Sequence, residues 1–278
     1  MPSSSAAYTS LRVTPVAGAD GVVDVTLLGP GFGNAMGPDF WRELPEVFAA
    51  LDTDDQVRAV VVHGSGEHFS VGLDLGAMMG ELGLGADPLA GGRVRFLDTI
   101  TRMQAAISAV EDCRKPVLAS VSGWCIGGGV DLIAACDIRV ASADAKFSVR
   151  EARLAIVADV GSLQRLPKVI GEGMTRRLAL TAEDITATRA EQIGLVSQIY
   201  DTPDAALTGA RALAAQIAGL SPLATQGTKQ VLNATRDLPV ADGLRHVAVW
   251  NAAFLHSHDL DEAIAAFQER RDARFEGR

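Results

Sequence analysis

"GWCIGGGVDLIAACD" (residues 123–137) places three consecutive glycines directly before a run with apolar residues at helical spacing. We therefore expect a helix from about residue 128 to residue 136. The first turn of a helix has unpaired backbone N–H groups at the positive end of its dipole, and these can hold an oxygen anion. Glycine at position 128 would let a ligand carbonyl come close to the backbone. A tight turn is the alternative explanation, and the GxGxxG spacing of dinucleotide-binding sites is absent.

The segments around this stretch alternate between strand-like and helix-like patterns. "PVLASVSG" (116–123) predicts a buried strand just before it, and "CDIRVASADAKFSV" (136–149) predicts one or two more after it. Further upstream, "VVDVTLLG" (22–29) and "VRAVVVHGSG" (57–66) predict strands on either side of a helix in "PDFWRELPEVFAALDTD" (38–54). This alternation indicates βαβ units with a largely parallel, buried sheet, so the predicted fold class is α/β.

Three other parts of the chain differ from this pattern in periodicity and composition. After about residue 160 the pattern is helical almost to the C-terminus. Residues 80–93 are rich in glycine and lack periodicity, which predicts a mobile loop near the site. The first ten residues, "MPSSSAAYTS", are small and polar and lack the basic and apolar regions of a signal peptide, so we expect a flexible tail.

The composition narrows the class of protein. Hydrophobic residues make up 48% and charged residues 21% of the chain, as in soluble globular proteins. No apolar run reaches the length of about eighteen residues that a membrane-spanning helix needs. A net charge of −9 argues against nucleic acid as a partner. The cysteines and histidines lack metal-binding spacing, and the cysteines (Cys113, Cys125 and Cys136) lack a disulfide pattern, so we expect no metal and a reducing, cytoplasmic location.

Three acidic residues follow or lie within the glycine-rich stretch: Asp131, Glu151 and Asp159. Each has an ordinary explanation. Asp131 would complement the helix dipole, Asp159 would cap a helix that begins near Gly161, and Glu151 would pair with a neighbouring arginine on the surface. Their closeness in the sequence to candidate oxyanion donors favours instead a site that moves protons beside a carbonyl group.

"HFSVGLDL" (68–75) supplies the second candidate donor. It follows a predicted strand and places Gly72 in a turn, which would leave the backbone N–H of Val71 free. A simple strand-to-helix turn is the alternative explanation for this segment. The GxSxG elbow and the Ser-His-Asp arrangement of hydrolases are both absent.

Five stretches, in order, carry a resemblance to a known family: "GNAM…FWREL", "RAVVVHGSGEHFSVGLDL", "KPVLASVSGWCIGGGVDLIAACDIR", "ADVGSLQRLPKVIG" and "SPLATQGTK…VWN". From Val22 to the C-terminus the chain resembles the enoyl-CoA hydratase/isomerase (crotonase) superfamily, and more closely its Δ3,5-Δ2,4-dienoyl-CoA isomerase branch. The resemblance implies a spiral of ββα units with a helical C-terminal trimerisation region. The implied division is a tail (1–11), a spiral core (12–205) and a C-terminal helical region (206–278).

The resemblance also implies partners and chemistry. The substrate would be an acyl-CoA of fatty acid β-oxidation, and no cofactor beyond the CoA of the substrate would be needed. The chain would form homotrimers, which usually pair into hexamers, and would bind neither nucleic acid nor membrane. The family often has a basic residue before "NAM", but here the segment reads "GPGFGNAM" (29–36). Arg93, Arg95 or Arg274 are the candidate substitutes for contacts to the CoA phosphates.

Site residues carry over position by position. Val71 and Gly128 resemble the two backbone donors to the thioester oxygen. Asp131 and Glu151 occupy positions where hydratases of the family carry glutamates, and Asp159 falls where dienoyl isomerases have aspartate. The resemblance implies further substrate contacts from the two glycine-containing segments and the "NAM" segment: Ala35, Met36, Ser70, Gly72, Leu73, Asp74, Leu75 and Gly127.

The predicted reaction moves a proton from C2 to C6 of a 3,5-dienoyl-CoA and gives the 2,4-dienoyl-CoA. In this hypothesis Glu151 takes the C2 proton, Asp159 delivers one at C6, and Asp131 supports Asp159 or tunes its protonation. Because three nearby carboxyl groups in an apolar pocket cannot all ionise, one is expected to be protonated.

Several alternatives stay open. An enoyl-CoA hydratase would need two glutamates on one water, and the shorter Asp131 argues against it. Another lyase or isomerase of the superfamily, acting on a non-fatty acyl-CoA, would share the fold. A non-catalytic RNA-binding member is a third alternative, which the acidic charge and the intact set of acids oppose.

Overall fold

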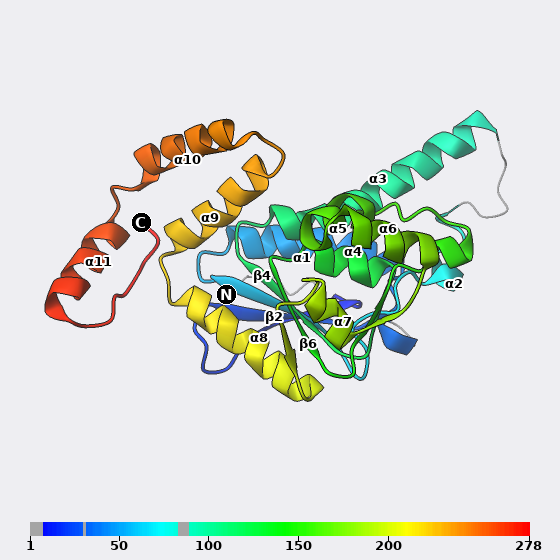
Figure 1. The fold of residues 1–278 in the computed structure, drawn as a ribbon, viewed down its shortest axis with the longest axis horizontal. Helices are drawn as coiled ribbons and strands as arrows, with labels where there is room; N and C mark the ends of the chain where they lie inside the picture. The colour runs from blue at the N-terminus through cyan, green and yellow to red at the C-terminus, as the bar shows by residue number, and fades with distance from the viewer. Residues whose placement is uncertain (1–7, 30–31, 83–88) are drawn as a thin grey trace.

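The computed structural model describes residues 8–29, 32–82 and 89–278. Its main sheet has six strands in the order β1-β2-β3-β4-β6-β9 (Figure 1). The strand bounds are β1 Leu11–Pro15, β2 Val22–Leu27, β3 Ala59–Gly64, β4 Val117–Val121, β6 Ile138–Ser142 and β9 Gln198–Tyr200. β1 is antiparallel to β2, and every other pair in this sheet is parallel. The predicted strands and their parallel pairing are therefore confirmed.

Helices cover both faces of this sheet, which explains why its central strands β2, β3 and β4 are buried along most of their length. Successive side chains point to opposite faces, and they divide into two clusters. One cluster joins Val61 and Leu118 to the small alanines of α8 (Pro203–Ala218). The other joins Val60 and Val62 to α1 (Pro38–Thr53) and α3 (Ala90–Asp112). The sheet is thus the middle layer between helices.

A smaller sheet lies beside the first and shapes the site. Its strands, in the order β5-β7-β8, are Trp124–Ile126, Lys146–Ser148 and Ile185–Thr186. α4 (Gly128–Ala135) starts two residues after β5, as the glycine-rich stretch predicted. α4 packs against α5 (Ser162–Ile170), which in turn packs against α6 (Glu172–Thr181). The remaining short elements are 3-10 helices η1 (Phe32–Asn34) and η2 (Glu151–Leu154) and helices α2 (Leu75–Met78) and α7 (Ala187–Gln192).

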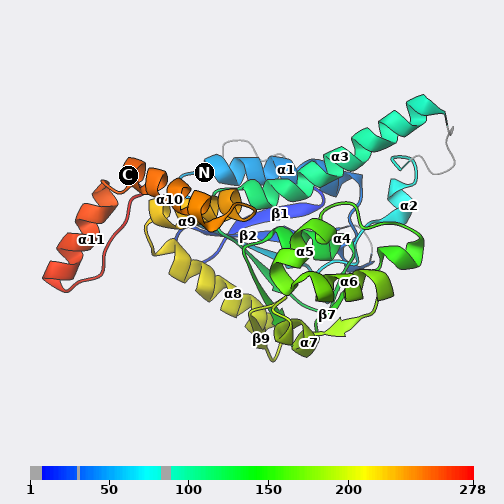
Figure 2. The same cartoon turned by 45° about the horizontal axis from the view of Figure 1, so that its top comes forward.

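Three C-terminal helices extend from the body as an arm (Figures 1 and 2). They are α9 (Pro222–Thr235), α10 (Val240–Phe254) and α11 (His258–Glu269). α10 has no buried residue, although it carries several apolar ones. The final residues return toward the body, where Arg58 donates to the Phe275 carbonyl at 2.6 Å. The boundary between the spiral core and the C-terminal helical region, at residues 205 and 206, stays a prediction. In the structure α8 begins at Pro203, crosses this boundary and packs on the sheet.

The expectation of a loop over residues 80–93 is wrong in part. α3 begins at Ala90, while residues 83–88 lie outside the described part of the chain. The first two turns of α3 have no buried residue, so this sequence lacks the apolar stripe by which a helix is recognised. The N-terminal tail, residues 1–7, likewise lies outside the described residues. No helix in the described ranges is long and apolar enough to cross a membrane.

Candidate active site

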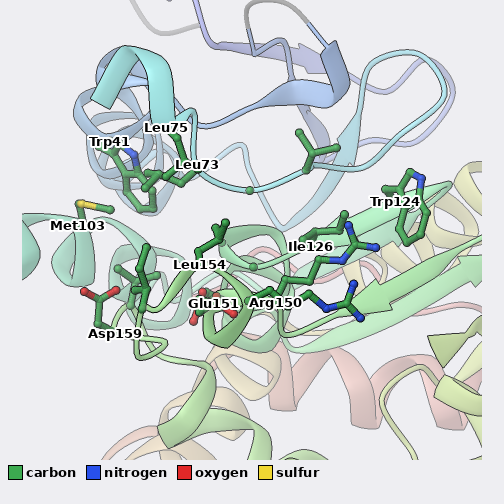
Figure 3. Close-up of a pocket in the computed structure, with 18 of the residues that line it drawn as sticks. Trp41, Leu73, Leu75, Met103, Trp124, Ile126, Arg150, Glu151, Leu154 and Asp159 are labelled. Carbon is green, nitrogen blue, oxygen red and sulfur yellow. The ribbon is translucent and has the colours of Figure 1, made fainter. Parts of the chain in front are cut away.

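The three acids come from different elements and line one cavity of about 570 Å³. Asp131 lies in the first turn of α4, Glu151 opens η2, and Asp159 lies in the segment that leads to α5. Figure 3 shows Asp159 and Met103 at one end of this cavity, Trp124 at the other, and Glu151 between them. The acids predicted from the sequence are thus brought together along one elongated pocket.

Asp131 is completely buried. It is therefore not a surface residue whose only effect is to complement the helix dipole. Its Oδ1 accepts two hydrogen bonds from Ser162, one from the backbone N–H at 2.5 Å and one from the hydroxyl at 2.6 Å. Its Oδ2 is buried without a partner among the described residues. Burial raises the pKa of Asp131 to about 6, against the lowering effect of the two Ser162 bonds.

Glu151 lies against the glycine turn. A Cβ atom at Gly127, whose φ is +51°, would lie only 3.3 Å from Glu151 Oε1, so glycine is needed there for two reasons. Glu151 Oε2 is buried and has no partner within the described residues. Burial, then the negative charge of Asp131, raises the pKa of Glu151 to about 7.

The ordinary explanation of Glu151 as half of a surface ion pair does not hold. Arg150 pairs instead with Asp184, through Nη2 to Oδ2 at 2.8 Å, and Arg153 lies 3.8 Å from the same carboxylate. The two arginines therefore neutralise a residue outside the cavity. Glu151 is left as a carboxyl group of unusual proton affinity inside it.

Asp159 is half-buried, and burial raises its pKa as well. It does not cap α5, whose N-cap residue is Gly161. Its backbone carbonyl accepts a hydrogen bond from Gln104 Nε2 of α3 at 2.6 Å. Its carboxyl group is thus available to a ligand, while its backbone is attached to a neighbouring helix.

The predicted oxyanion donor Val71 needs correction. Its N–H donates to the Gly33 carbonyl at 2.8 Å, so it is not free. The N–H two residues later, on Leu73, has no acceptor within the described ranges. A Cβ atom on Gly128 would lie 3.9 Å from the Leu73 nitrogen, so the Leu73 and Gly128 N–H groups border the same space. Gly128 is the first residue of α4, where an N–H has no partner within the helix.

The predicted substrate contacts divide into two groups. Gly72, Leu73, Leu75 and Gly127 line the cavity, as does the Val71 residue itself. Ala35, Met36, Ser70 and Asp74 do not line it. Three of these residues support the ones that do: Ser70 Oγ accepts the Gly72 N–H at 3.1 Å, Asp74 Oδ1 caps α2, and Met36 N–H donates to the Gly72 carbonyl.

The cavity also has a lining that residue patterns did not reveal: Phe32, Trp41, Met103, Trp124, Ile126, Arg150, Arg153, Leu154, Ile156 and Val160. Most are apolar residues at positions that also suit a core. Two cations flank the Trp124 ring, Lys146 with Nζ 5.1 Å from its centroid and Arg150 with Cζ at 4.7 Å. One end of the cavity is therefore apolar with a single acid, and the other is aromatic and cationic.

The model of the enoyl-CoA hydratase/isomerase family matches residues 17–278. The chain belongs to this family. It is 42% identical over 270 residues to the peroxisomal Delta(3,5)-Delta(2,4)-dienoyl-CoA isomerase of Arabidopsis thaliana, and the match covers 96% of this chain and 97% of the relative. It is 43% identical over 267 residues to the mitochondrial Delta(3,5)-Delta(2,4)-dienoyl-CoA isomerase of Homo sapiens, with 95% of this chain and 81% of the relative covered.

Solved structures of the family agree with the fold. The crystal structure of an enoyl-CoA hydratase from Bacillus anthracis matches with a TM-score of 0.87 at 26% identity, over 97% of this chain and 100% of that one. The predicted crotonase-like α/β fold with a helical C-terminal region is confirmed. The prediction of a cytoplasmic location is contradicted, because the similar relatives are named as peroxisomal or mitochondrial proteins.

Proposed function

We propose that this family member isomerises 3,5-dienoyl-CoA to 2,4-dienoyl-CoA. The observation that carries the proposal is the spacing of carboxyl groups along the cavity, with Glu151 near its middle and Asp159 at its apolar end. A proton that leaves C2 and one that arrives at C6 need two separate acid–base groups. Relatives about 42% identical over nearly the full chain bear the name of this activity, which supports the same choice.

The thioester carbonyl is expected to lie between the Leu73 and Gly128 N–H groups. Both are fixed by the backbone, so they need no rearrangement as negative charge develops on the oxygen. The dipole of α4 adds to this effect at its first residue. Gly72 lets the segments that carry the Leu73 and Gly128 N–H groups lie close together, because glycine adopts its φ of +84° without strain.

The proton transfers then follow the cavity. Glu151 takes the C2 proton, and the electron pair of the C2–H bond moves into a conjugated enolate that extends from the thioester oxygen through both double bonds to C6. Asp159, protonated, delivers a proton to C6, which leaves double bonds at C2–C3 and C4–C5. Glu151 and Asp159 return to their starting states by exchanging protons with solvent. The raised pKa values of both groups suit this role, because each must hold and release a proton near neutral pH.

A hydratase is the weaker candidate. It would require Asp131 and Glu151 to grip one water molecule together, yet one oxygen of Asp131 is already held by two bonds from Ser162. Asp159 would also have no task in water addition. The hydration of 2-enoyl-CoA is accordingly expected to be slow.

The CoA arm is expected to leave the cavity past Trp124, because the acyl chain runs the other way, toward Asp159. Lys146, Arg150 and Arg153 offer positive charge at that end in a chain of net charge −9. Arg150 and Arg153 line the cavity and Lys146 lies over the Trp124 ring, so these residues replace Arg93, Arg95 and Arg274, none of which lines the cavity, as candidate contacts for the anionic arm. No cofactor is proposed, since the reaction moves protons and not electrons.

Self-association into trimers, and of trimers into hexamers, is also part of the proposal. Its support is the arm of α9 to α11, which exposes large apolar side chains, among them Leu244, Val249 and Phe267. Such surfaces are usually covered by another protein surface.

An ultraviolet assay tests the function directly. The purified chain is given a 3,5-dienoyl-CoA, and the conjugated 2,4-dienoyl product is recorded, with 2-enoyl-CoA hydration measured in parallel. We expect rapid conjugation, negligible hydration, and a loss of conjugation of at least about 100-fold in Asp159→Asn. An Asp159→Asn variant with intact activity would rule out the mechanism, and hydration without isomerisation would rule out the function.

A further inference from the structure

Ser162 is the direct hydrogen-bonding partner of the buried acid Asp131, although it does not line the cavity. Its side chain is completely buried at the first position of α5. Both of its donors, the backbone N–H and the hydroxyl, go to the same oxygen, Asp131 Oδ1. Two short bonds to one carboxyl oxygen are typical of an ionised carboxylate, which accepts without donating.

The other carboxyl oxygens nearby lack such partners. Asp131 Oδ2 and Glu151 Oε2 are both buried and unpartnered among the described residues. Two carboxyl groups this close repel each other when both are ionised, so a proton added to the pair must settle on one of them. The donors of Ser162 favour the ionised form of Asp131, and Glu151 has no corresponding side-chain donor.

Other charges around the pair do not replace Ser162. Asp159 is a third acid and adds repulsion. The charge of Arg165 on α5 lowers the pKa of Asp131, but its guanidinium bonds Glu111 at 2.7 Å and Ser108 at 3.0 Å. The thiol of Cys125, whose pKa burial raises well above its ordinary value, stays neutral. Ser162 therefore supplies the direct stabilisation of the Asp131 anion.

We propose that Ser162 is a positioning residue that holds Asp131 as the fixed anion of the acid group, so that Glu151 is the member that binds and releases the mobile proton. The inference rests on the proposed function, because it assigns which carboxyl group acts as the base. It gives Asp131 a definite task, which is to raise the proton affinity of Glu151 by charge without exchanging a proton itself.

The test is the pH profile of kcat/KM for dienoyl isomerisation in Ser162→Ala. Loss of the hydroxyl donor lets the proton settle on Asp131 as well as on Glu151, so the pair holds its last proton more tightly and the acidic limb should move to higher pH by about one unit. At pH values well below the limb, this shift is a loss of about tenfold in kcat/KM relative to wild type at the same pH. Ser162→Thr keeps the hydroxyl and should restore the limb. A loss that is equal at every pH, with an unmoved limb, would overturn the inference.

Two further variants keep the test decisive. Asp131→Asn removes the negative charge beside Glu151, so the acidic limb of the pH profile of this variant should move to lower pH. This is the opposite direction to the shift in Ser162→Ala, and an upward shift in Asp131→Asn would contradict the assignment. Ser142→Ala is the matched control, since Ser142 is equally buried and donates to Asp144 at 2.5 Å, and its limb should stay in place. Wild-type protein without isomerase activity would refute the proposed function, whereas active wild type with an unmoved Ser162→Ala limb refutes only this inference.

Discussion

Glu151 is a single residue whose burial in the site lowers the stability of the folded chain once its carboxyl group ionises. Its Oε2 is buried and has no partner among the described residues, and burial raises its pKa from 4.5 to about 7. A raised pKa means that the folded chain binds this proton more tightly than the unfolded chain. The resulting contribution to the free energy of unfolding is fully present below about pH 4.5 and is lost as the pH rises through about 7.

Glu151→Gln should therefore be more stable than the wild type at pH 8, by up to about 3 kcal/mol, and its stability should vary less between pH 4.5 and pH 7. Urea unfolding at fixed protein concentration measures both effects. Glu172→Gln, at an exposed position paired with Arg176, is the control and should change little. Equal stability of Glu151→Gln and wild type at pH 8 would show that the ionised Glu151 carboxylate does not destabilise the folded chain.

Gly72 carries the geometry of the oxyanion site. A Cβ atom there would lie 2.7 Å from the Ile126 carbonyl and 3.2 Å from the Gly128 nitrogen. Gly72→Ala should lower kcat/KM by about 100-fold, because the two donors must move apart. Gly66→Ala provides the comparison, since Gly66 also has a positive φ (+72°) but open space around it, and should cost only about 1 kcal/mol of stability. Similar activity in both variants would argue against the Leu73–Gly128 pair as the oxyanion site.

At the scale of elements, the site depends on contacts between α3, α4 and α5. α4 supplies Asp131, α5 fixes it through Ser162, and α3 attaches the Asp159 segment through Gln104. The carboxyl groups therefore depend on how these helices pack, and less on the loops that join them. Helix packing changes little under thermal motion, which keeps acid–base groups in place.

Gln104→Ala should lower kcat for isomerisation by about tenfold while the binding of substrate changes little, because a displaced Asp159 would miss C6. Steady-state kinetics with dienoyl-CoA gives both quantities. Thr101→Ala on the same helix is the control, since the Thr101 hydroxyl bonds only its own helix, at the Leu97 carbonyl. If Gln104→Ala matched wild type in kcat, the bond to Asp159 would have no role in catalysis.

The arm of α9 to α11 exposes several large apolar side chains in the single chain. Leu244 on α10 is 63% exposed and Phe267 on α11 is 86% exposed. Burial of such residues is favourable by about 25 cal/mol per Å² of apolar surface, which favours association. The body behind the arm is already complete, with both faces of its sheet covered.

Leu244→Asp should shift the chain from trimers or hexamers toward monomers in sedimentation or light scattering. A charge in an apolar interface is costly when it has no partner. Leu180→Asp on α6 tests the specificity, because Leu180 is 78% exposed on a different surface and its replacement should leave the mass unchanged. A wild-type chain that stays monomeric at high concentration would refute the proposed assembly.

Local patterns in the sequence were sufficient for the central strands, for α1 and for α4. Their signals are local: β-branched runs buried on both faces, apolar residues at helical spacing, and a glycine stretch before a helix. β1 was missed, and so were β5, β8 and β9, whose two or three residues carry no periodicity; β8 and β9 lie where the pattern predicted only helices. α3 was missed because its first turns are exposed. The identity of the acids likewise came from the sequence, since residue type and family resemblance suffice to single them out.

The arrangement of the site follows from contacts between residues far apart in the sequence. Val71 and Leu73 both lie in the same glycine turn, and the sequence did not indicate that the Gly33 carbonyl takes the Val71 N–H and leaves Leu73 free. Nor could it show that Ser162 bonds Asp131, or that Asp184 draws the arginines away from Glu151. Residue type determines which chemistry is possible. Hydrogen bonds between residues far apart in the chain determine which groups remain free to perform it.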